Sequence, residues 1–253
     1  MKIVSDSETN FLLESVEQGG VLGRYSFIGI QPRELFKSSG NQIEFLDITG
    51  RKQIFSDIDP MRKLSEIVSQ YTQPELPELP VFAGGAVGYV SYDYVRFIEK
   101  IPSLLPDDLM FPDLCFQMCF DLIVFDHLKR KIQIISNARI KKGQSIREAY
   151  KKSCDKIESI FSMIKKPLNY QKAPCNRQKR NFVSNCTQKE FENSVVRAKK
   201  YIREGDIIQV VLSQRWERPI DISPLSGYRA LRSVNPSPYM FYLGFAEKSL
   251  VGS

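Results

Sequence analysis

The chain has 253 residues, of which 42% are hydrophobic and 11% aromatic, a composition that is ordinary for a globular protein. It has 36 Lys and Arg against 29 Asp and Glu, so its formal net charge is +7, which suits an acidic small-molecule ligand. No apolar run reaches the length of about 18 residues that a membrane-spanning helix needs, and residues 1–10 lack the apolar stretch of a secretory signal. We therefore expect a cytoplasmic protein without a membrane partner.

Cysteine and histidine usage limits the disulfides, metal sites and catalytic triads that the chain can form. The five cysteines form no C-x-x-C pair and cannot all pair with one another, so we expect free thiols in a reducing compartment. His127 is the single histidine, which argues against a histidine-based metal site or a triad that contains histidine.

A basic segment over residues 165–182 carries Lys and Arg but no Asp or Glu. We interpret it as a solvated linker in preference to a nucleic-acid patch, and we expect no nucleic-acid partner. This segment divides the chain into three expected parts: a first domain over 1–140, a helix with the basic linker over 141–186, and the start of a second domain over 187–253.

Short strands are expected over residues 1–140, with turns at Gly19-Gly20, Gly40-Asn41, Thr49-Gly50 and Gly84-Gly85, and a further turn is expected at Ala246-Glu247-Lys248. Apolar and polar residues alternate over 116–125, which predicts one half-buried strand, and a turn over 126–131 leads to a returning strand over 132–135. Cys115 and Cys119 fall on the less apolar face of this strand. Their spacing in a strand is too long for a disulfide.

Helices and strands alternate in the rest of the chain. The spacing predicts a helix over 144–166 whose apolar stripe consists of Ile146, Tyr150, Ser153, Ile157, Ile160 and Ile164. Thr187 and Glu190 form a capping box for a helix that ends at Gly205, and a strand-like run follows over 206–219. Ser223-Pro224 begins a short helix, and strands over 239–245 and 249–251 make a terminal hairpin. These elements indicate an α+β fold with largely antiparallel sheets.

Common cofactor and nucleophile motifs are absent: there is no G-x-G-x-x-G, P-loop, H-E-x-x-H or G-x-S-x-G sequence. Four other stretches are specific when taken together. They are FLLESVEQGGVLGRYSFIG (11–29), GGAVGYVSYDYVRFIE (84–99), EGDIIQVVLSQRW (204–216) and NPSPYMFYL (235–243).

In order and spacing, these stretches resemble the first half of anthranilate synthase component I. The resemblance implies a sandwich of two antiparallel sheets with outer helices, here truncated. Family members are about twice as long, so we expect this chain to be an N-terminal half whose terminal hairpin needs further strands.

The resemblance also implies a function. Such enzymes convert chorismate and ammonia to anthranilate and pyruvate, with Mg²⁺ as cofactor and a glutamine amidotransferase subunit as the source of ammonia. L-Tryptophan is expected to inhibit them by binding at positions that match Ser15, Pro238, Tyr239 and Met240, with Leu13 and Glu14 contributing. The alternative interpretation is structural, with 12–15 as a strand end and 235–240 as a turn into a strand.

Three further residues receive roles from the resemblance. Gln209 stands where water-adding relatives have lysine, so we expect it to orient ammonia, although a glutamine in a strand usually faces solvent. Arg96 is expected to form a buried pair with Asp93 and to support inhibition, and Asn235 is expected to support the tryptophan site. The family's Mg²⁺ ligands and catalytic histidine are expected beyond residue 253, so this chain alone should not catalyse the reaction.

Two other functions remain open. Aminodeoxychorismate synthase component I, of the folate pathway, resembles the chain over the same stretches but usually lacks the Tyr-Met pair found here as Tyr239 and Met240. The second is a fragment that binds tryptophan without catalysis.

Overall fold

The computed structural model describes residues 10–15, 23–32, 34–103, 106–140, 143–167, 181–245 and 248–253. The chain forms two compact units, one of residues 1–170 with 223–253 and the other of residues 171–222. The expected boundaries near 140 and 186 stay a prediction. Two expected turns, at Gly19-Gly20 and Ala246-Glu247, and most of the basic segment lie outside the described residues.

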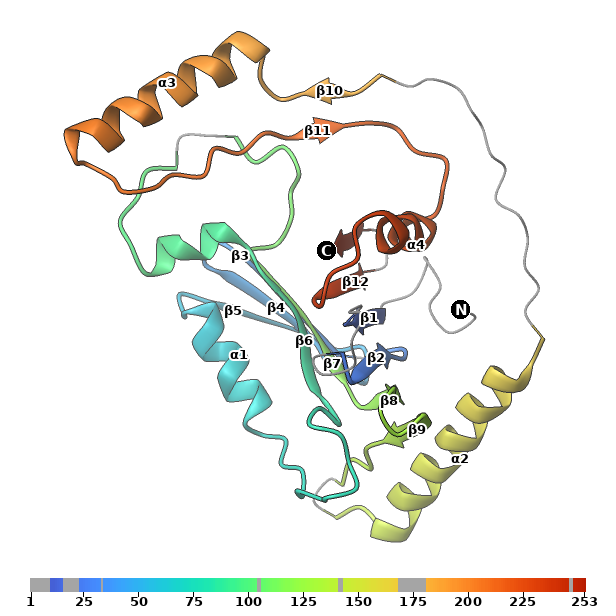
Figure 1. The fold of residues 1–253 in the computed structure, drawn as a ribbon. Coiled ribbons are helices and arrows are strands. Elements are labelled where there is room, and N and C mark those ends of the chain that lie inside the picture. Colours follow the sequence, from blue (N-terminus) through green and yellow to red (C-terminus); the bar gives the residue numbers. More distant parts are fainter. Residues whose placement is uncertain are drawn as a thin grey trace. The chain divides into compact units, whose positions relative to one another are not determined.

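The first unit contains two antiparallel sheets (Figure 1). The six-stranded sheet has the order β13 (Lys248–Gly252), β12 (Met240–Phe245), β1 (Asn10–Glu14), β2 (Tyr25–Gly29), β8 (Asp121–Asp126) and β9 (Lys131–Ser136). The five-stranded sheet has the order β5 (Lys52–Ser56), β4 (Gln42–Leu46), β3 (Glu34–Ser39), β7 (Leu114–Cys119) and β6 (Gly85–Val90).

Three helices and a 3₁₀ turn complete this unit: α1 (Pro60–Val68), η1 (Tyr92–Phe97), α2 (Ile146–Lys165) and α4 (Pro224–Val234). Their starts follow capping rules, since Asp59, Ser145 and Ser223 accept hydrogen bonds from backbone N–H groups of the first turn. Figure 1 shows α1 on one side of the paired sheets and α2 and α4 on the other. The expected sandwich with outer helices is confirmed.

Three apolar clusters hold these layers together. Residues of both sheets meet in the middle cluster, which includes Phe11, Leu122, Val124, Leu243 and Cys115. The outer face of the six-stranded sheet packs against Ile160 of α2 and Tyr228 of α4, and the outer face of the five-stranded sheet packs against Leu64 and Ile67 of α1. Each sheet is therefore apolar on both faces.

Gln117 of β7 makes a polar link between the two sheets. Its side chain is fully buried, and its Nε2 donates to the carbonyl oxygens of Asn10 in β1 at 3.3 Å and Gly244 in β12 at 2.7 Å. Because two carbonyl groups of the opposite sheet share this donor, the link fixes the register of one sheet over the other.

The single strand expected over 116–125 is wrong. The chain breaks at Phe120, so that β7 lies in the five-stranded sheet and β8 in the six-stranded one. Cys115 and Cys119 are buried between the sheets as free thiols, and burial raises the pKa of each to about 12. A single alternating pattern in the sequence therefore corresponds to two strands in different sheets, each of which is buried on both faces. The returning strand was expected correctly and is β9.

The helix expected over 144–166 is confirmed as α2, but its apolar stripe is only partly right. Ile160 is buried and Ile164 packs against the core, whereas Ile146 and Tyr150 are each 68% exposed. The first half of α2 therefore turns a different face inward from the one that its apolar residues define.

The second unit contains β10 (Val183–Ser184), α3 (Gln188–Glu204) and β11 (Trp216–Glu217). The capping box of Thr187 with Glu190 is present, and Gly205 ends α3 with a φ of 82°. The long strand expected over 206–219 is wrong, because only β11 is extended and paired there. Ile208 is 97% exposed, so among the described residues no neighbouring strand stabilises this apolar run.

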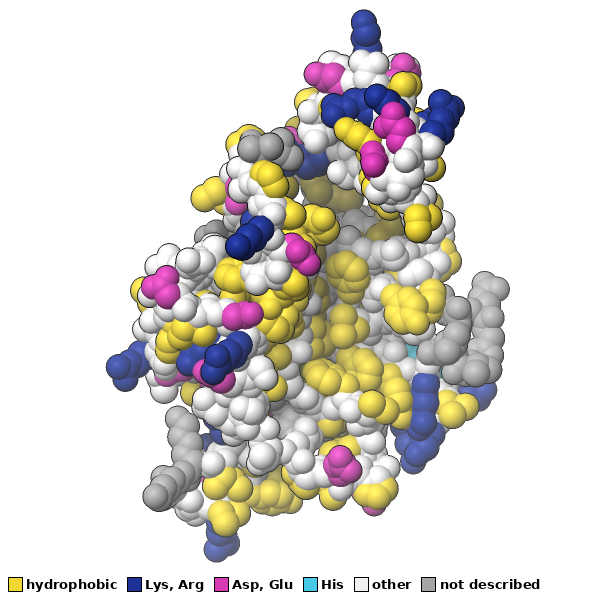
Figure 2. Space-filling model, turned by 90° about the vertical axis from the view of Figure 1, so that its left-hand side faces the viewer, with side chains coloured by type: hydrophobic (Ala, Val, Ile, Leu, Met, Phe, Trp, Pro, Cys, Tyr) yellow, Lys and Arg dark blue, Asp and Glu magenta, His cyan; other side chains and the backbone are white. Residues whose placement is uncertain are grey.

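Hydrophobic side chains also remain at the surface, and Figure 2 shows many of them gathered on one face. None of the helices in the described ranges combines the length and the apolar character needed to cross a membrane.

Candidate functional site

A cavity of about 790 Å³ opens between the two sheets of the first unit, and we call it the inter-sheet cavity. Strands β1, β2 and β12 form one wall, and β6 with Phe82 and Phe116 forms the other. The walls are mainly aromatic and aliphatic, and the polar side chains lie near the ends of β1 and β2. A cavity of this size and character can enclose a small molecule that has a flat apolar part and a few polar groups.

All six residues expected to bind tryptophan line this cavity. They come from two distant stretches, which β1 and β12 bring together by antiparallel pairing of Glu14 with Met240. Met240 is buried, whereas Tyr239 is 81% exposed at the edge of the cavity. The six residues are Leu13, Glu14, Ser15, Pro238, Tyr239 and Met240. The identity of their ligand stays a prediction.

Ser15 provides an unused hydrogen-bonding group. Its Oγ is buried and has no hydrogen-bond partner among the described residues. Gly23 lies directly beside it, and a Cβ at that position would meet the carbonyl oxygen of Ser15 at 3.0 Å and its Oγ at 3.3 Å. Because a buried hydroxyl group without a partner is costly, Ser15 is suited to accept a ligand as its partner.

Glu14 is held from the side of α4. The Tyr228 hydroxyl donates to Glu14 Oε2 at 2.5 Å, and Arg232 Nε donates to the same oxygen at 3.1 Å. Tyr228 is fully buried, and both burial and this hydrogen bond raise its pKa, so it remains a donor. Two donors on one oxygen fix the carboxylate on the α4 side of the six-stranded sheet.

Sequence reasoning missed Arg24 as a lining residue. Its Nη2 donates to Asp126 Oδ2 at 2.9 Å and its Nε contacts both carboxylate oxygens at 3.3 Å, which leaves Nη1 toward other partners. Arg24 stands in the quoted GRYSFIG stretch, and Tyr89, another missed lining residue, stands in GGAVGYV. Arg24 and Tyr89 could therefore have been predicted as lining residues from their positions in these two stretches.

Three other expected residues are not among those that line the inter-sheet cavity. Gln209 is exposed in the irregular part of the second unit. Arg96 pairs with Asp93 at 2.9 Å as expected, but their side chains are 34% and 57% exposed, so the expectation of a buried pair is wrong. The pair lies within η1, none of whose residues is fully buried. Asn235 ends α4, and its carbonyl oxygen accepts from Ser253 Oγ at 2.6 Å.

Within the described ranges, no group of three or more His, Cys, Asp or Glu side chains could hold a metal ion. The described residues therefore do not fit a Mg²⁺ site. His127 is occupied elsewhere, since its Nε2 lies 2.8 Å from Ser26 Oγ.

Comparison with models of known protein families identifies the class of protein to which this sandwich and its cavity belong. A model described as "chorismate binding enzyme" matches residues 8–253. The chain belongs to this family of chorismate-binding enzymes.

Individual relatives refine this assignment. Anthranilate synthase component 1 of Acetivibrio thermocellus is 38% identical over 258 residues, covering 100% of this chain and 52% of the relative. The Saccharomyces cerevisiae protein of the same name is 36% identical over 253 residues, covering 98% of this chain and 47% of the relative. The crystal structure of anthranilate synthase component I from Streptococcus pneumoniae TIGR4 matches with a TM-score of 0.75 and 28% identity, over 94% of this chain and 51% of that one. The chain thus spans about half the length of these relatives.

Proposed function

We propose that this chain is the amino-terminal part of an anthranilate synthase component I and that its inter-sheet cavity binds L-tryptophan as a feedback inhibitor. The observation that carries the proposal is the meeting of Leu13, Glu14 and Ser15 with residues 238–240 at one cavity. The whole protein would convert chorismate and ammonia to anthranilate and pyruvate. Mg²⁺ and a glutamine amidotransferase subunit would be required for the glutamine-dependent reaction, and the expected location remains the cytoplasm.

The cavity offers a partner for each part of the amino acid. Glu14, which is one of the lining residues, would attract the ammonium group by its negative charge, and Ser15 Oγ would hydrogen-bond to the ligand's polar end. Arg24 would pair with the carboxylate, since it reaches the cavity while Asp126 holds its other nitrogens. Phe27, Phe82 and Tyr89 would enclose the indole ring, because flat aromatic ligands pack well against such side chains.

The named relatives support the tryptophan branch over the folate branch, because both curated ones are anthranilate synthases. Gln209 is proposed to orient ammonia in the complete enzyme. Gln209 is exposed in this chain. The test of its role is Gln209→Ala in a complete enzyme, which should lower ammonia-dependent turnover.

The direct test is calorimetric titration of the chain with L-tryptophan. We expect saturable binding that Ser15→Leu weakens about tenfold or more, because the larger side chain removes a hydrogen-bonding group and occupies ligand space. L-Alanine serves as the ligand control, since it has the same charges but cannot fill the aromatic part of the cavity.

Ser194→Leu is the matched variant, because it makes the same change on the exposed surface of α3. It should bind L-tryptophan as the unchanged chain does. Absence of binding by the unchanged chain, or equal affinity in Ser15→Leu, would refute the assignment of the inter-sheet cavity.

A further inference from the structure

A second cavity, of about 560 Å³, lies beside α2, and we call it the α2 cavity. It is separate from the inter-sheet cavity, since the two share no lining residue. Its apolar floor includes Ile30, Ile48 and Phe120, and its polar residues come from the end of β9 and from α2. The charged side chains that line it are Arg139, Lys152, Lys156 and Asp121.

The orientation of α2 is the first sign that this cavity has a function. Ala149, Lys152, Ser153 and Lys156 follow one helix face and line the cavity, while Ile146 and Tyr150 on another face are each 68% exposed. Burial of Ile146 and Tyr150 would stabilise the fold more than placing Lys156 inward, while Lys152 remains exposed to solvent. A local conflict of this kind between sequence pattern and packing is typical of functional sites.

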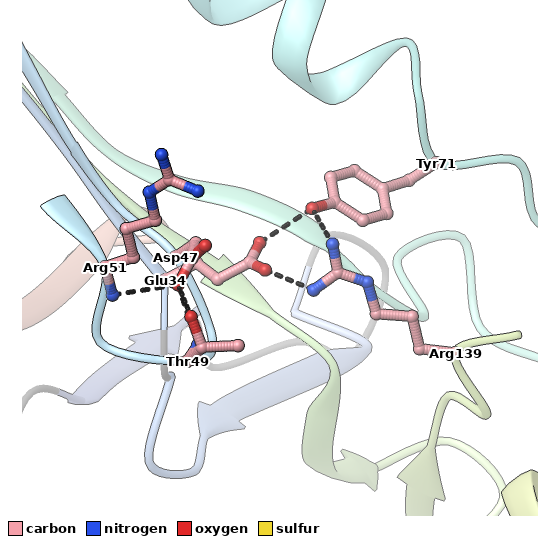
Figure 3. Close-up of polar contacts among 6 residues, drawn as sticks. All are labelled: Glu34, Asp47, Thr49, Arg51, Tyr71 and Arg139. Atoms are coloured by element: carbon pink, nitrogen blue, oxygen red, sulfur yellow. Dashed lines mark hydrogen bonds and ion pairs between the residues drawn. The ribbon is translucent and has the colours of Figure 1, made fainter. Parts of the chain in front are cut away.

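Arg139 is held rigidly at the wall of the cavity (Figure 3). Its Nη1 donates to Glu34, which is fully buried, and its Nη2 donates to the Tyr71 hydroxyl at 2.7 Å. That hydroxyl in turn donates to Glu34 Oε2 at 2.8 Å, and the guanidinium lies 5.5 Å from the centre of the Phe120 ring. The guanidinium is therefore fixed before any ligand arrives.

Lys156 is also positioned by neighbouring residues. Its Nζ donates to Gln31 Oε1 at 3.2 Å and lies 4.0 Å from Asp121 Oδ2, while Asp121 Oδ1 accepts from Ser136 Oγ at 2.6 Å. Gln31 has a φ of 45°, a left-handed conformation that is uncommon for a residue with a side chain and concentrates at functional sites.

The charges do not cancel in this cavity. Glu34 compensates Arg139, and Asp121 is the carboxylate nearest to Lys156. Among the lining residues this leaves Lys152 without a carboxylate of its own. One negative group on a ligand would balance the charge of Lys152, close to the charged groups of Lys156 and Arg139 that line the same cavity.

We propose that the α2 cavity binds a small organic anion. A carboxylate or phosphate group of the ligand interacts with Lys152 and Lys156, and its apolar body lies against Ile30, Ile48 and Phe120. Arg139 forms the rigid wall that orients the negative group. This proposal does not depend on the ligand of the inter-sheet cavity.

The test is calorimetric titration of the full chain with two probes, malonate and inorganic phosphate, at an ionic strength balanced with sodium chloride. We expect saturable binding of one probe, and the tighter probe identifies the recognised group as carboxylate or phosphate. The double variant Lys152→Gln with Lys156→Gln should bind about tenfold more weakly or worse.

Two further variants make the result decisive. Lys151→Gln with Lys189→Gln removes the same charge at positions that do not line the α2 cavity and should leave the affinity unchanged. Ser153→Glu places a carboxylate in the cavity and should abolish binding without removing a lysine. Equal affinity in the Lys152 and Lys156 double variant and in its control, no saturable binding of either probe, or displacement of the probe by L-tryptophan would overturn the proposal.

Discussion

Two pairs of arginine and carboxylate in the first unit differ in their surroundings. Glu34 of β3 is fully buried and pairs with Arg139, which lies 105 residues further along the chain. Asp93 pairs with Arg96 three residues away in η1, and their side chains are 57% and 34% exposed. The exposed pair can be found in the sequence by its spacing, whereas the buried pair exists only because folding brings β3, the end of α1 and the end of β9 together.

The difference teaches where charge matters for stability. A carboxylate removed from water depends on its partner, because without that partner it remains desolvated and uncompensated. An exposed carboxylate that loses its partner is simply solvated by water. We therefore expect the loss of stability to follow the burial of the carboxylate and not the length of the ion-pair contact.

Arg139→Ala should have the largest effect. Glu34 would keep only the Tyr71 hydroxyl as a donor, so we expect the free energy of unfolding to fall by about 3–5 kcal/mol. Urea denaturation followed by circular dichroism measures this change. Arg51→Ala is a suitable control on the neighbouring turn. The contact of Arg51 shown in Figure 3 comes from its backbone N–H, which donates to Asp47 Oδ1 at 3.0 Å and is kept in the alanine variant. A loss below about 1 kcal/mol for Arg139→Ala would mean that burial does not set the effect.

An intermediate case is Asp126, whose side chain is 4% exposed while that of its partner Arg24 is 37% exposed. Hydrogen bonds from Arg24 lower the pKa of Asp126 to about 2. Because an unfolded aspartate titrates near about 3.9, the pair stabilises the fold fully above that pH, and the stabilisation is lost as the pH falls toward the folded pKa.

Asp126→Asn should therefore reduce stability at pH 7 and flatten the decline of stability between about pH 4 and pH 2. Thermal denaturation measured across this range tests the expectation. Asp155→Asn, an exposed position on α2, provides the same change of charge without an ion pair. Parallel pH profiles for the Asp126 variant and the unchanged chain would contradict the assigned cause.

The same contrast between local and distant contacts explains what the sequence could predict. Helix α3 and the terminal hairpin were foreseen because a capping box and alternating residues are local signals. The run over 206–215 has an equally strong strand pattern, yet it is irregular because no described strand pairs with it, whereas β12 lies between β1 and β13. The switch of sheets at Phe120 was missed for a related reason, since both strands continue one alternating pattern.

The inter-sheet cavity follows this rule as well. Glu14 and Met240 were expected together only through family resemblance, and their contact depends on the pairing of β1 with β12 across most of the chain. Tyr228 and Arg232 donate the hydrogen bonds that hold Glu14. No local sequence signal predicts this, because both residues lie on α4 and reach β1 only after folding. The α2 cavity had no sequence signal either, since the apolar stripe of α2 shares only Ser153 with the residues that line this cavity.

Arg96→Ala should have the smallest effect and provides the strictest test of the comparison. Arg96 Nη1 also donates to the carbonyl oxygens of Ile101 at 3.4 Å and Pro102 at 2.7 Å, so the change removes contacts with three residues, yet all of them are exposed to water. We expect the free energy of unfolding to fall by no more than about 1 kcal/mol. Because Arg96 does not line the inter-sheet cavity, the affinity for L-tryptophan should stay the same, even though the sequence suggested a part in inhibition. Denaturation and calorimetry on one preparation separate the two quantities. A loss of stability close to that of Arg139→Ala would show that three-residue spacing matters as much as burial, whereas a weaker affinity at unchanged stability would show that η1 communicates with the cavity.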